Sequence, residues 1–537
     1  MRRALWVLFW SVVSMVGGYH LLKGGLGEDA SPVDKLAEVM SIVVANYVDS
    51  VDDQRSVENA IRGLLEELDP HSLYIAARDV QHANEPLTGS FEGIGVEFNI
   101  LDDTIVVVAP IVGGPSEEVG IRAGDKIVRI DGKSAVGFTT DMVLKTLRGP
   151  EGTKVRVTIV RSGVKDPLEF VITRGKIPLY SVDAAYMIND SVGYVKVSRF
   201  AAPTPREFAK AIRELKHQGM RRLILDLRGN PGGYLKSAVL MADEFLPAGR
   251  IIMYAEGRAR IREEYTATRS GMLETEPLAV IIDQGSASAS EIISGAIQDW
   301  DRGVIVGRRS YGKGLVQEDF YLRDGSVLRL TVARYHTPSG RVIQRPYRHG
   351  RQGMLEYEME MLRRWERGEY FSSDSIPVPD SLKYFTVGGR VVYGGGGIMP
   401  DVFVPLDTSE VSTYVNQLIA QGILSEFVLH YLDGQRQHLL EQYPSVADFI
   451  QSYRVTTNLM IDLMKAAKAA GLASPAFHEK RAFYRYGKRQ VKALLARHLY
   501  GMNGYFQVVN LYDSDVRRAL EILTTTAYNR ILKSKIL

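Results

Sequence analysis

The chain has 537 residues, which suggests roughly three or four domains, and a formal net charge of +3 from 66 basic and 63 acidic residues. This near balance gives no indication of a nucleic-acid partner. The absence of cysteine excludes thiol catalysis, disulfide bonds and a lipoprotein anchor cysteine.

Residues 1–30 carry the features of an export signal. Arg2 and Arg3 precede an apolar run over residues 4–17. When residues 19–22 are included, the stretch reaches about the length of a membrane span, so we predict either a signal peptide or a membrane anchor. A buried core helix is the alternative interpretation.

Region 31–89 is predicted to contain two amphipathic helices. Apolar residues recur three and four apart over 34–47 and 57–68, and the second helix closes on Leu-Asp-Pro at 68–70. We interpret the pair as a small helical cap or as a dimerisation element.

Region 90–175 has the layout of a PDZ domain. Short β-branched runs at 104–108 and 154–160 flank a predicted helix at 140–147. The loop ahead of them would capture a peptide's terminal carboxylate with backbone N–H groups, and it comprises Gly93, Ile94, Gly95 and Val96. The same four residues would also fit a plain glycine-bearing strand.

Region 176–345 alternates predicted strands with predicted helices. The strands cover 192–197, 222–227 and 278–283, and the helices cover 205–217 and 235–245. This alternation indicates α/β layering.

Ser288, Lys313 and Gln317 form the candidate catalytic group. Ser288 precedes a predicted helix at 291–300, where free N–H groups and the helix dipole stabilise negative charge, although Ser-x-x-Glu is also a capping box. Lys313 opens a strand-like run at 315–322, on which Gln317 would share its face. A lysine can act as a base only if its pKa falls, as burial would cause, and a glutamine can orient the amine without adding negative charge.

Two other motifs lead to no cofactor or metal prediction. The spacing at 307–314 is that of a phosphate-binding loop, but Gly314 replaces the Ser or Thr that would hold magnesium, and a strand follows. No His-Glu-x-x-His is present, and His336 is interpreted as structural rather than as a triad base. We therefore predict no cofactor and no metal.

Several separated motifs resemble those of the carboxy-terminal processing proteases, which are PDZ-containing serine peptidases. They are Leu-Asp-Pro-His-Ser-Leu-Tyr at 68–74, Gly-Ile-Gly-Val-Glu-Phe at 93–98, the segments 225–233, 284–292 and 307–314, and Tyr-His-Thr-Pro-Ser-Gly-Arg at 335–341. The resemblance covers about residues 35–345. It implies a crotonase-like core, with Ser288 rather than Ser286 or Ser290 as nucleophile, Lys313 as base and Gln317 as its support.

The oxyanion hole would combine the N–H of Ala289, just after the nucleophile, with that of Gly232 or Gly233. The loop 229–233 also fits a tight turn between a strand and a helix. The sequence does not distinguish between the two glycines.

The remainder departs from compact relatives. An insertion at 346–395, with a helix predicted at 354–368, separates the core from its end at 396–405. It could shape the substrate tunnel, contact another subunit or decorate the surface. Region 406–537 is predicted to be mostly helical, at 410–421, 446–470 and 515–532, with faces that serve core packing or partner recruitment.

Together these features predict an α/β multidomain endopeptidase of the bacterial cell envelope, exported to the periplasmic side. It would bind protein or peptide substrates by the C-terminus and cleave them through an acyl-enzyme. Membrane association through the N-terminal segment and homo-oligomer formation stay open. The alternatives are a catalytically silent PDZ adaptor or chaperone and a serine hydrolase of non-peptide substrates.

Overall fold

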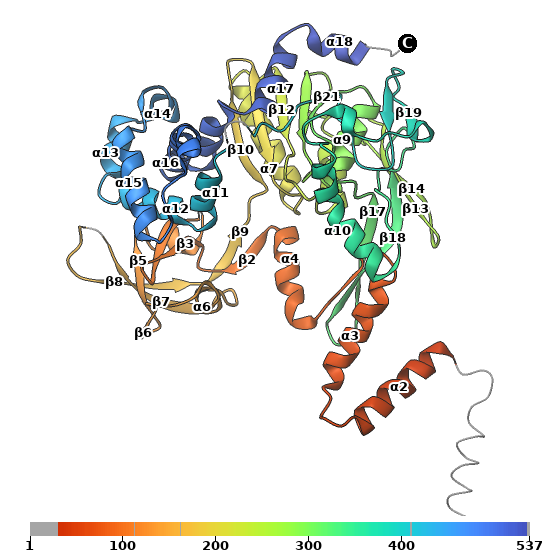
Figure 1. The fold of residues 1–537 in the computed structure, drawn as a ribbon, viewed down its shortest axis with the longest axis horizontal. Helices are drawn as coiled ribbons and strands as arrows, with labels where there is room; N and C mark the ends of the chain where they lie inside the picture. Colours follow the sequence, from red (N-terminus) through yellow and green to blue (C-terminus); the bar gives the residue numbers. More distant parts are fainter. Residues whose placement is uncertain (1–30, 112, 162, 409–410, 534–537) are drawn as a thin grey trace, which may run out of the picture.

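The computed structural model describes residues 31–533 except for residues 112, 162 and 409–410 (Figure 1). The predicted signal peptide or anchor at 1–30 lies outside these residues. Among the helices that are described, none is both long enough and apolar enough to cross a membrane.

The N-terminal region contains the two predicted helices. They are α2 (Pro32–Asn46) and α3 (Asp53–Glu66), followed by the short strand β1 (Leu73–Ile75) and by α4 (Val80–Thr88). Ser31 and Asp52 cap α2 and α3 by accepting backbone N–H bonds. Helix α2 has no buried residue and projects from the body of the molecule (Figure 1).

The predicted PDZ domain is a sheet with the strand order β3-β4-β5-β7-β8, in which β6 pairs with β5. Its strands are β3 (Val96–Leu101), β4 (Thr104–Pro110), β5 (Lys126–Ile130), β6 (Lys133–Ser134), β7 (Lys154–Val160) and β8 (Leu168–Thr173), and its helices are α5 (Pro115–Glu118) and α6 (Thr140–Leu147). The chain enters through β2 (Ser90–Gly93) and leaves through β9 (Gly175–Pro178), which pair antiparallel. This two-stranded stem joins the domain to the protease core.

The core is built on a sheet with the order β10-β11-β12-β15-β16-β21, parallel from β11 onward. The strands are β10 (Val182–Met187), β11 (Val192–Val197), β12 (Arg222–Asp226), β15 (Leu278–Ile282), β16 (Val304–Gly307) and β21 (Val402–Phe403). On one face lie α7 (Thr204–His217), α8 (Leu235–Ala242) and α9 (Ala289–Asp299). The predicted α/β layering is confirmed.

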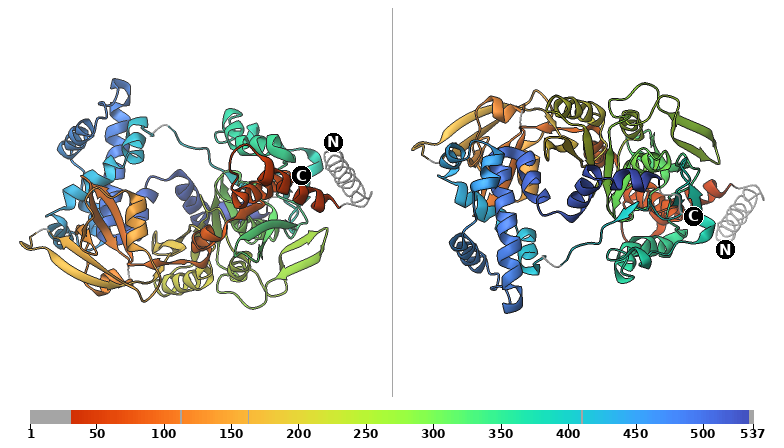
Figure 2. Two further views of the ribbon diagram at one scale, coloured as in Figure 1. Left: turned by 90° about the horizontal axis from the view of Figure 1, so that it is seen from below. Right: turned by 90° about the horizontal axis from the view of Figure 1, so that it is seen from above.

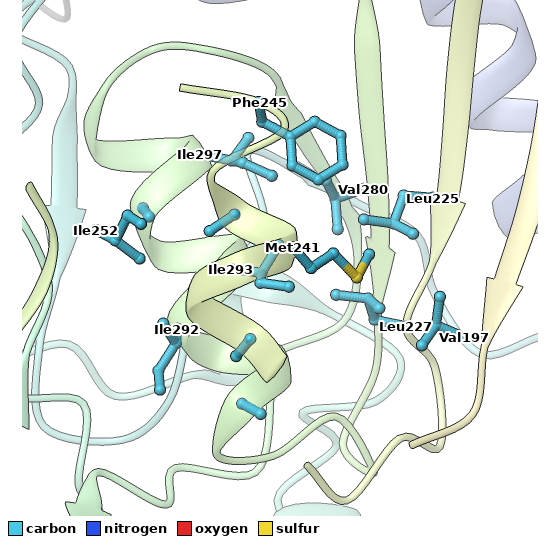
Figure 3. Packing of buried hydrophobic residues seen from close by; sticks show 14 of the residues in the cluster. Val197, Leu225, Leu227, Met241, Phe245, Ile252, Val280, Ile292, Ile293 and Ile297 are labelled. Atoms are coloured by element: carbon cyan, nitrogen blue, oxygen red, sulfur yellow. The ribbon is translucent and has the colours of Figure 1, made fainter. Parts of the chain in front are cut away.

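Successive residues of these strands are apolar because both faces of the sheet are covered. In Figure 3, Met241 of α8 and Ile293 of α9 meet Leu225 and Val280 of the sheet. The opposite face packs on α17 (Ser514–Thr524) through Val516. Ser288 lies beyond the turn 283–287 that follows β15, and it is the N-cap of α9, in which every residue is buried.

A second sheet completes the core, in the order β1-β18-β13-β14 with β17 also paired to β18. Its further strands are β13 (Ile251–Gly257), β14 (Arg260–Thr266), β17 (Leu315–Tyr321) and β18 (Val327–His336). Because β1 pairs with β18, the 68–74 motif lies beside the strands that follow Lys313.

The insertion forms α10 (Gly350–Glu366) and the hairpin of β19 (Lys383–Phe385) and β20 (Val391–Tyr393). Beyond the core come α11 (Thr413–Ala420), α12 (Ile423–Leu432), α13 (Arg436–Gln442), α14 (Val446–Ser452), α15 (Thr457–Ala469), α16 (Lys480–Asn510), α17 and α18 (Ala527–Lys533). Two predictions are wrong in detail. The helix predicted at 446–470 is divided because Thr456 caps a new helix, and the one at 515–532 is divided at Thr525, which has extended backbone angles.

Helices α11 to α16 lie beside the PDZ domain, and both views in Figure 2 place them together, away from α10, whereas α17 and α18 lie on the protease core. Leu429 of α12 clusters with Leu101, Val106 and Val108 of the PDZ sheet. Arg497 of α16 forms an ion pair with Glu97 of β3. The PDZ domain is thus held both by its stem and by the C-terminal helices.

Candidate active site

Ser288 has a backbone conformation that a serine rarely adopts. Its φ of 53° and ψ of −112° lie outside the left-handed helical region, and strain of this kind is concentrated at functional sites. The two neighbouring serines are fully buried, and their hydroxyls bond backbone carbonyls: Ser286 Oγ donates to Leu227 O (2.8 Å) and Ser290 Oγ to Asn230 O (3.0 Å). Ser288, by contrast, lines a cavity.

That cavity has a volume of about 370 Å³ and brings together residues from five segments of the chain. Ser288, Lys313 and Gln317 all line it, and so do Gly233 and Ala289. The residues that the sequence predicted to act together therefore share one cavity.

The amine of Lys313 donates to the side-chain oxygen of Gln317 over 2.9 Å, as predicted from their spacing. Burial lowers the pKa of Lys313, and the positive charge of Arg329 lowers it further, while Asp69 and Glu291 act in the opposite direction. Gln317 is itself oriented, because its amide nitrogen donates to the backbone oxygen of His71 over 2.5 Å. The lysine thus has the environment that a neutral amine base requires.

Glu291 joins the backbones of the two candidate catalytic residues. Its carboxylate accepts the N–H of Ser288 (2.8 Å) and that of Lys313 (2.9 Å), together with the N–H of Gly312 (2.7 Å). Burial raises the pKa of Glu291 to about 7. The capping-box pattern predicted the contact with Ser288, but nothing in the sequence predicted the contact with the lysine loop.

Tyr335 also connects the backbones of Ser288 and Lys313, through their carbonyl groups. Its hydroxyl lies 3.1 Å from the carbonyl oxygen of Ser288 and 2.9 Å from that of Lys313, and the side chain is 1% exposed. Sequence reasoning gave this tyrosine no role. Because Glu291 and Tyr335 each hold both backbones, the relative position of Ser288 and Lys313 is fixed by buried groups.

The candidate oxyanion donors differ in their hydrogen bonding. The N–H of Gly232 donates to Asn230 Oδ1 over 2.9 Å, so it is already engaged. A Cβ atom on Gly232 would lie 2.8 Å from that of Ser288, which explains why glycine is needed at this close approach. Gly233 and Ala289 both line the cavity. Their N–H groups are the better candidates.

His336 contacts residues other than those that line the Ser288 cavity. Its Nδ1 is 3.1 Å from the carbonyl oxygen of Gly340, and its ring stacks on Tyr254 with the centroids 4.5 Å apart. These contacts fit the structural role that was predicted for it.

One group of potential metal ligands occurs within the part of the chain that is described. Asp102 of the PDZ domain and Glu426 and His430 of α12 can each place a ligand atom within 4.8 Å of the other two. Asp102 and His430 are exposed, and the group is separate from the residues that line the Ser288 cavity.

The predicted carboxylate-binding loop lies at the edge of the PDZ sheet. Gly93 ends β2 and Val96 begins β3, whose one partner within the sheet is β4. Gly95 has a φ of 75°, which favours glycine. Ile94 is buried in the same apolar cluster as Val143 of α6. The loop, the edge strand and α6 therefore lie together, as a peptide site of this type requires.

Four family models match separate parts of the chain. Peptidase family S41 matches residues 191–348, and a PDZ domain matches 106–161. The N-terminal domain of the activating protease CtpB matches 23–78, and a family of unknown function, DUF8443, matches 414–501.

Relatives with similar sequences are bacterial proteases. A carboxy-terminal-processing protease of Bartonella bacilliformis is 37% identical over 314 residues, which cover 58% of this chain and 72% of that protein. Carboxy-terminal processing protease CtpB of Bacillus subtilis is 36% identical over 316 residues, covering 58% of this chain and 66% of the relative. Among solved structures, the photosystem II D1 C-terminal processing protease is 31% identical with a TM-score of 0.35, covering 58% of this chain and 84% of that one.

Proposed function

Because the chain belongs to the carboxy-terminal processing proteases, a family of serine-type peptidases, we propose that it cleaves exported or misfolded proteins near their C-termini through a Ser288–Lys313 dyad. The observation that carries the proposal is the shared cavity, which Ser288, Lys313 and Gln317 line together with Gly233 and Ala289.

The chemistry follows from the contacts of these residues. The neutral amine of Lys313 takes the proton of Ser288 Oγ as that oxygen attacks the carbonyl carbon of the scissile peptide bond. The N–H groups of Gly233 and Ala289 donate to the oxyanion that forms. Lys313 then gives the proton to the leaving amine, and the C–N bond breaks to leave an acyl-enzyme ester on Ser288.

Water completes the cycle. Lys313 accepts a proton from the water that attacks the ester, and it returns this proton to Ser288 Oγ as the new carboxylic acid leaves. Gln317 holds the amine in place throughout with its side-chain oxygen, 2.9 Å away. No metal or cofactor takes part in this proposal.

Substrate selection is assigned to the PDZ domain. The loop of Gly93, Ile94, Gly95 and Val96 would bind the terminal carboxylate through backbone N–H groups, and β3 would pair with the peptide. Apolar last residues are expected, because Ile94 and Val96 belong to an apolar cluster.

Location and assembly complete the proposal. The basic and apolar start of the chain supports export to the periplasmic side of a bacterial envelope, with residues 1–30 as signal or anchor. Helix α2 exposes Val33, Leu36, Val39 and Ile42. A lone helix with so much exposed apolar surface gains stability by packing, and we assign this surface to a second copy of the chain.

The test is labelling with a fluorophosphonate probe, followed by mapping of the modified peptide by mass spectrometry. We expect the label on Ser288, none in Ser288→Ala, and normal labelling in the control Ser290→Ala. Ser288→Ala, which should carry no label, should also fail to cleave casein. Label retained by Ser288→Ala would place the nucleophile elsewhere, and a wild-type protein with neither label nor cleavage would support the silent adaptor.

A further inference from the structure

The inserted segment 346–395 holds the loop that carries Lys313. Arg364 of α10 is 1% exposed, and its guanidinium donates to the carbonyl oxygens of Ser310 (2.8 Å), Tyr311 (3.3 Å) and Gly396 (3.2 Å). Burying an arginine is costly unless hydrogen bonds compensate its charge, and two of the three carbonyl oxygens that accept from Arg364 belong to the lysine loop. The inner face of α10 is therefore built against that loop.

A second arginine connects the insertion to the same loop. The guanidinium of Arg345 lies between two rings, 3.6 Å from the ring centroid of Tyr357 of α10 and 4.1 Å from that of Tyr311. Its side chain is 2% exposed, and such stacked contacts are strongest where water is excluded. Its backbone N–H also donates to Gly312 O over 3.0 Å.

The hydroxyl of Tyr357 is the point at which α10 approaches the catalytic group. It lies 2.9 Å from Nε2 of His71 and 3.3 Å from the side-chain nitrogen of Gln344. Gln344 uses its oxygen for the N–H of Gly314, so its nitrogen must be the donor to Tyr357. The tyrosine proton is then available for His71.

The protonation states agree with this assignment. Burial raises the pKa of Tyr357 to about 12, so the hydroxyl keeps its proton at neutral pH. Burial, assisted by the charge of Lys313, lowers the pKa of His71 to about 4, so the imidazole is neutral and has one accepting nitrogen.

Each of the two partners of the Tyr357 hydroxyl, His71 and Gln344, is connected by hydrogen bonds to Lys313 or to the residue after it. The backbone oxygen of His71 accepts the amide of Gln317, which in turn holds the amine of Lys313. On the other side, Gln344 holds the N–H of Gly314, the residue after the lysine. The turn that contains His71 is also held in place, because the backbone N–H of His71 donates to the buried carboxylate of Asp69 over 2.8 Å.

We propose that the insertion positions the base, and that Tyr357 is a positioning residue which acts through His71 and Gln317 on the side-chain amine of Lys313 and through Gln344 on its backbone. This inference rests on the proposed function, because it assumes that Lys313 is the base. It differs from the view of the insertion as surface decoration, because Tyr357 and Arg364 on the inner face of α10 are buried, whereas Leu355 and Met359 on its outer face are exposed.

The experiment compares Tyr357→Phe with the matched control Tyr370→Phe in the full-length protein. Both tyrosines are buried in the insertion, but the hydroxyl of Tyr370 bonds Met361 O, within the insertion itself. For Tyr357→Phe we expect kcat to fall about 3-fold to 30-fold with KM within about twofold, since orientation is lost and substrate binding is not. The acid limb of the kcat/KM profile should move to higher pH, because a less confined amine is better hydrated and has a higher pKa. Tyr370→Phe should change neither quantity.

A double-mutant cycle tests whether the effect passes through Gln317. In a Gln317→Ala background, Tyr357→Phe should cost less than it does in the wild type. Unchanged kcat and pH profile in Tyr357→Phe, an equal loss in Tyr370→Phe, or full additivity with Gln317→Ala would each overturn the inference. If Tyr357→Phe does not fold, His71→Phe keeps the carbonyl that Gln317 uses and removes the ring nitrogen. The same fall in kcat is then expected, and an unchanged kcat overturns the inference.

The proposed function fails separately. If Lys313→Ala retains wild-type turnover, the base has been misassigned and the proposed function falls. If Lys313→Ala is inactive while Tyr357→Phe is normal, only the role of the insertion is lost.

Discussion

The catalytic centre and the PDZ domain are held in very different ways. Ser288 and Lys313 are joined through their backbones by Glu291 and Tyr335, both of which are buried. The PDZ domain is joined to the rest by a two-stranded stem, by the contacts of Leu429 and by an exposed ion pair. Peptide-bond cleavage therefore depends on a few side chains that buried hydrogen bonds hold in place. Peptide binding depends on a domain held by weaker contacts, each of which can be removed without the others. We expect substitutions in the catalytic centre to abolish turnover almost completely, and substitutions in the PDZ domain to weaken substrate binding by small factors.

The largest effect is expected at the dyad. Ser288→Ala and Lys313→Ala should each lower kcat by about 10⁴-fold or more, and the double variant should lose nothing further because the two groups act as one unit. Turnover of a casein-like substrate, measured on all three variants with Ser286→Ala as control, provides the check. Additive losses would mean that the two residues act independently.

Gln317 should give the next largest effect. Gln317→Ala should lower kcat about 10-fold to 1000-fold with substrate binding intact, because the lysine amine loses its orientation. Gln317→Glu places a negative charge beside the amine, which raises the pKa of Lys313. Since the base acts when unprotonated, the acid limb of the activity profile should move to higher pH, and a profile identical to the wild type would refute the contact in solution.

Recognition should respond by a smaller factor. Amidating the C-terminus of a peptide substrate removes the charge that the loop at Gly93–Val96 is proposed to bind, and hydrogen bonds to a charged group contribute about 1.5 to 3 kcal/mol. Binding or cleavage should weaken about 10-fold to 150-fold. Equal processing of the free-acid and amidated forms of one peptide would show that the domain does not select chain termini.

The sequence predicted the parts of the site that lie in contiguous motifs. The spacing of Lys313 and Gln317 along one strand predicted their contact, whereas the choice of Ser288 over Ser286 and Ser290 came from the resemblance to the protease family. Gly232 and Gly233 could not be distinguished, because the answer depends on the side chain of Asn230.

The contacts missed by sequence reasoning connect distant segments. Gln317 and His71 are 246 positions apart, and His71 and Tyr357 are 286 apart. No periodicity encodes such pairs, because they arise from the packing of separate elements. Helix α16 was missed for another reason: lysine, arginine and tyrosine interrupt its apolar spacing, and Gly501 breaks its helical geometry.

The smallest effect is expected at the contact between the PDZ domain and the C-terminal helices. Arg497 and Glu97 are 35% and 45% exposed, and exposed pairs contribute about 1 kcal/mol or less. Arg497→Ala should change KM for a peptide by less than about fivefold and leave kcat unaltered. A loss of kcat as large as that of Gln317→Ala would show that the orientation of the domain controls the chemistry, and the contrast between the two regions would fail.

The pH dependence of Ser288 labelling tests the central claim most directly. The rate of fluorophosphonate modification should rise with pH in a single titration step. The midpoint of this step should lie below the usual pKa of a lysine, because burial and the charge of Arg329 lower the pKa of Lys313. Lys313→Ala should abolish both the rapid labelling and the titration step. A step at the ordinary lysine pKa, or one that persists in Lys313→Ala, would contradict the account of a buried neutral lysine as the base.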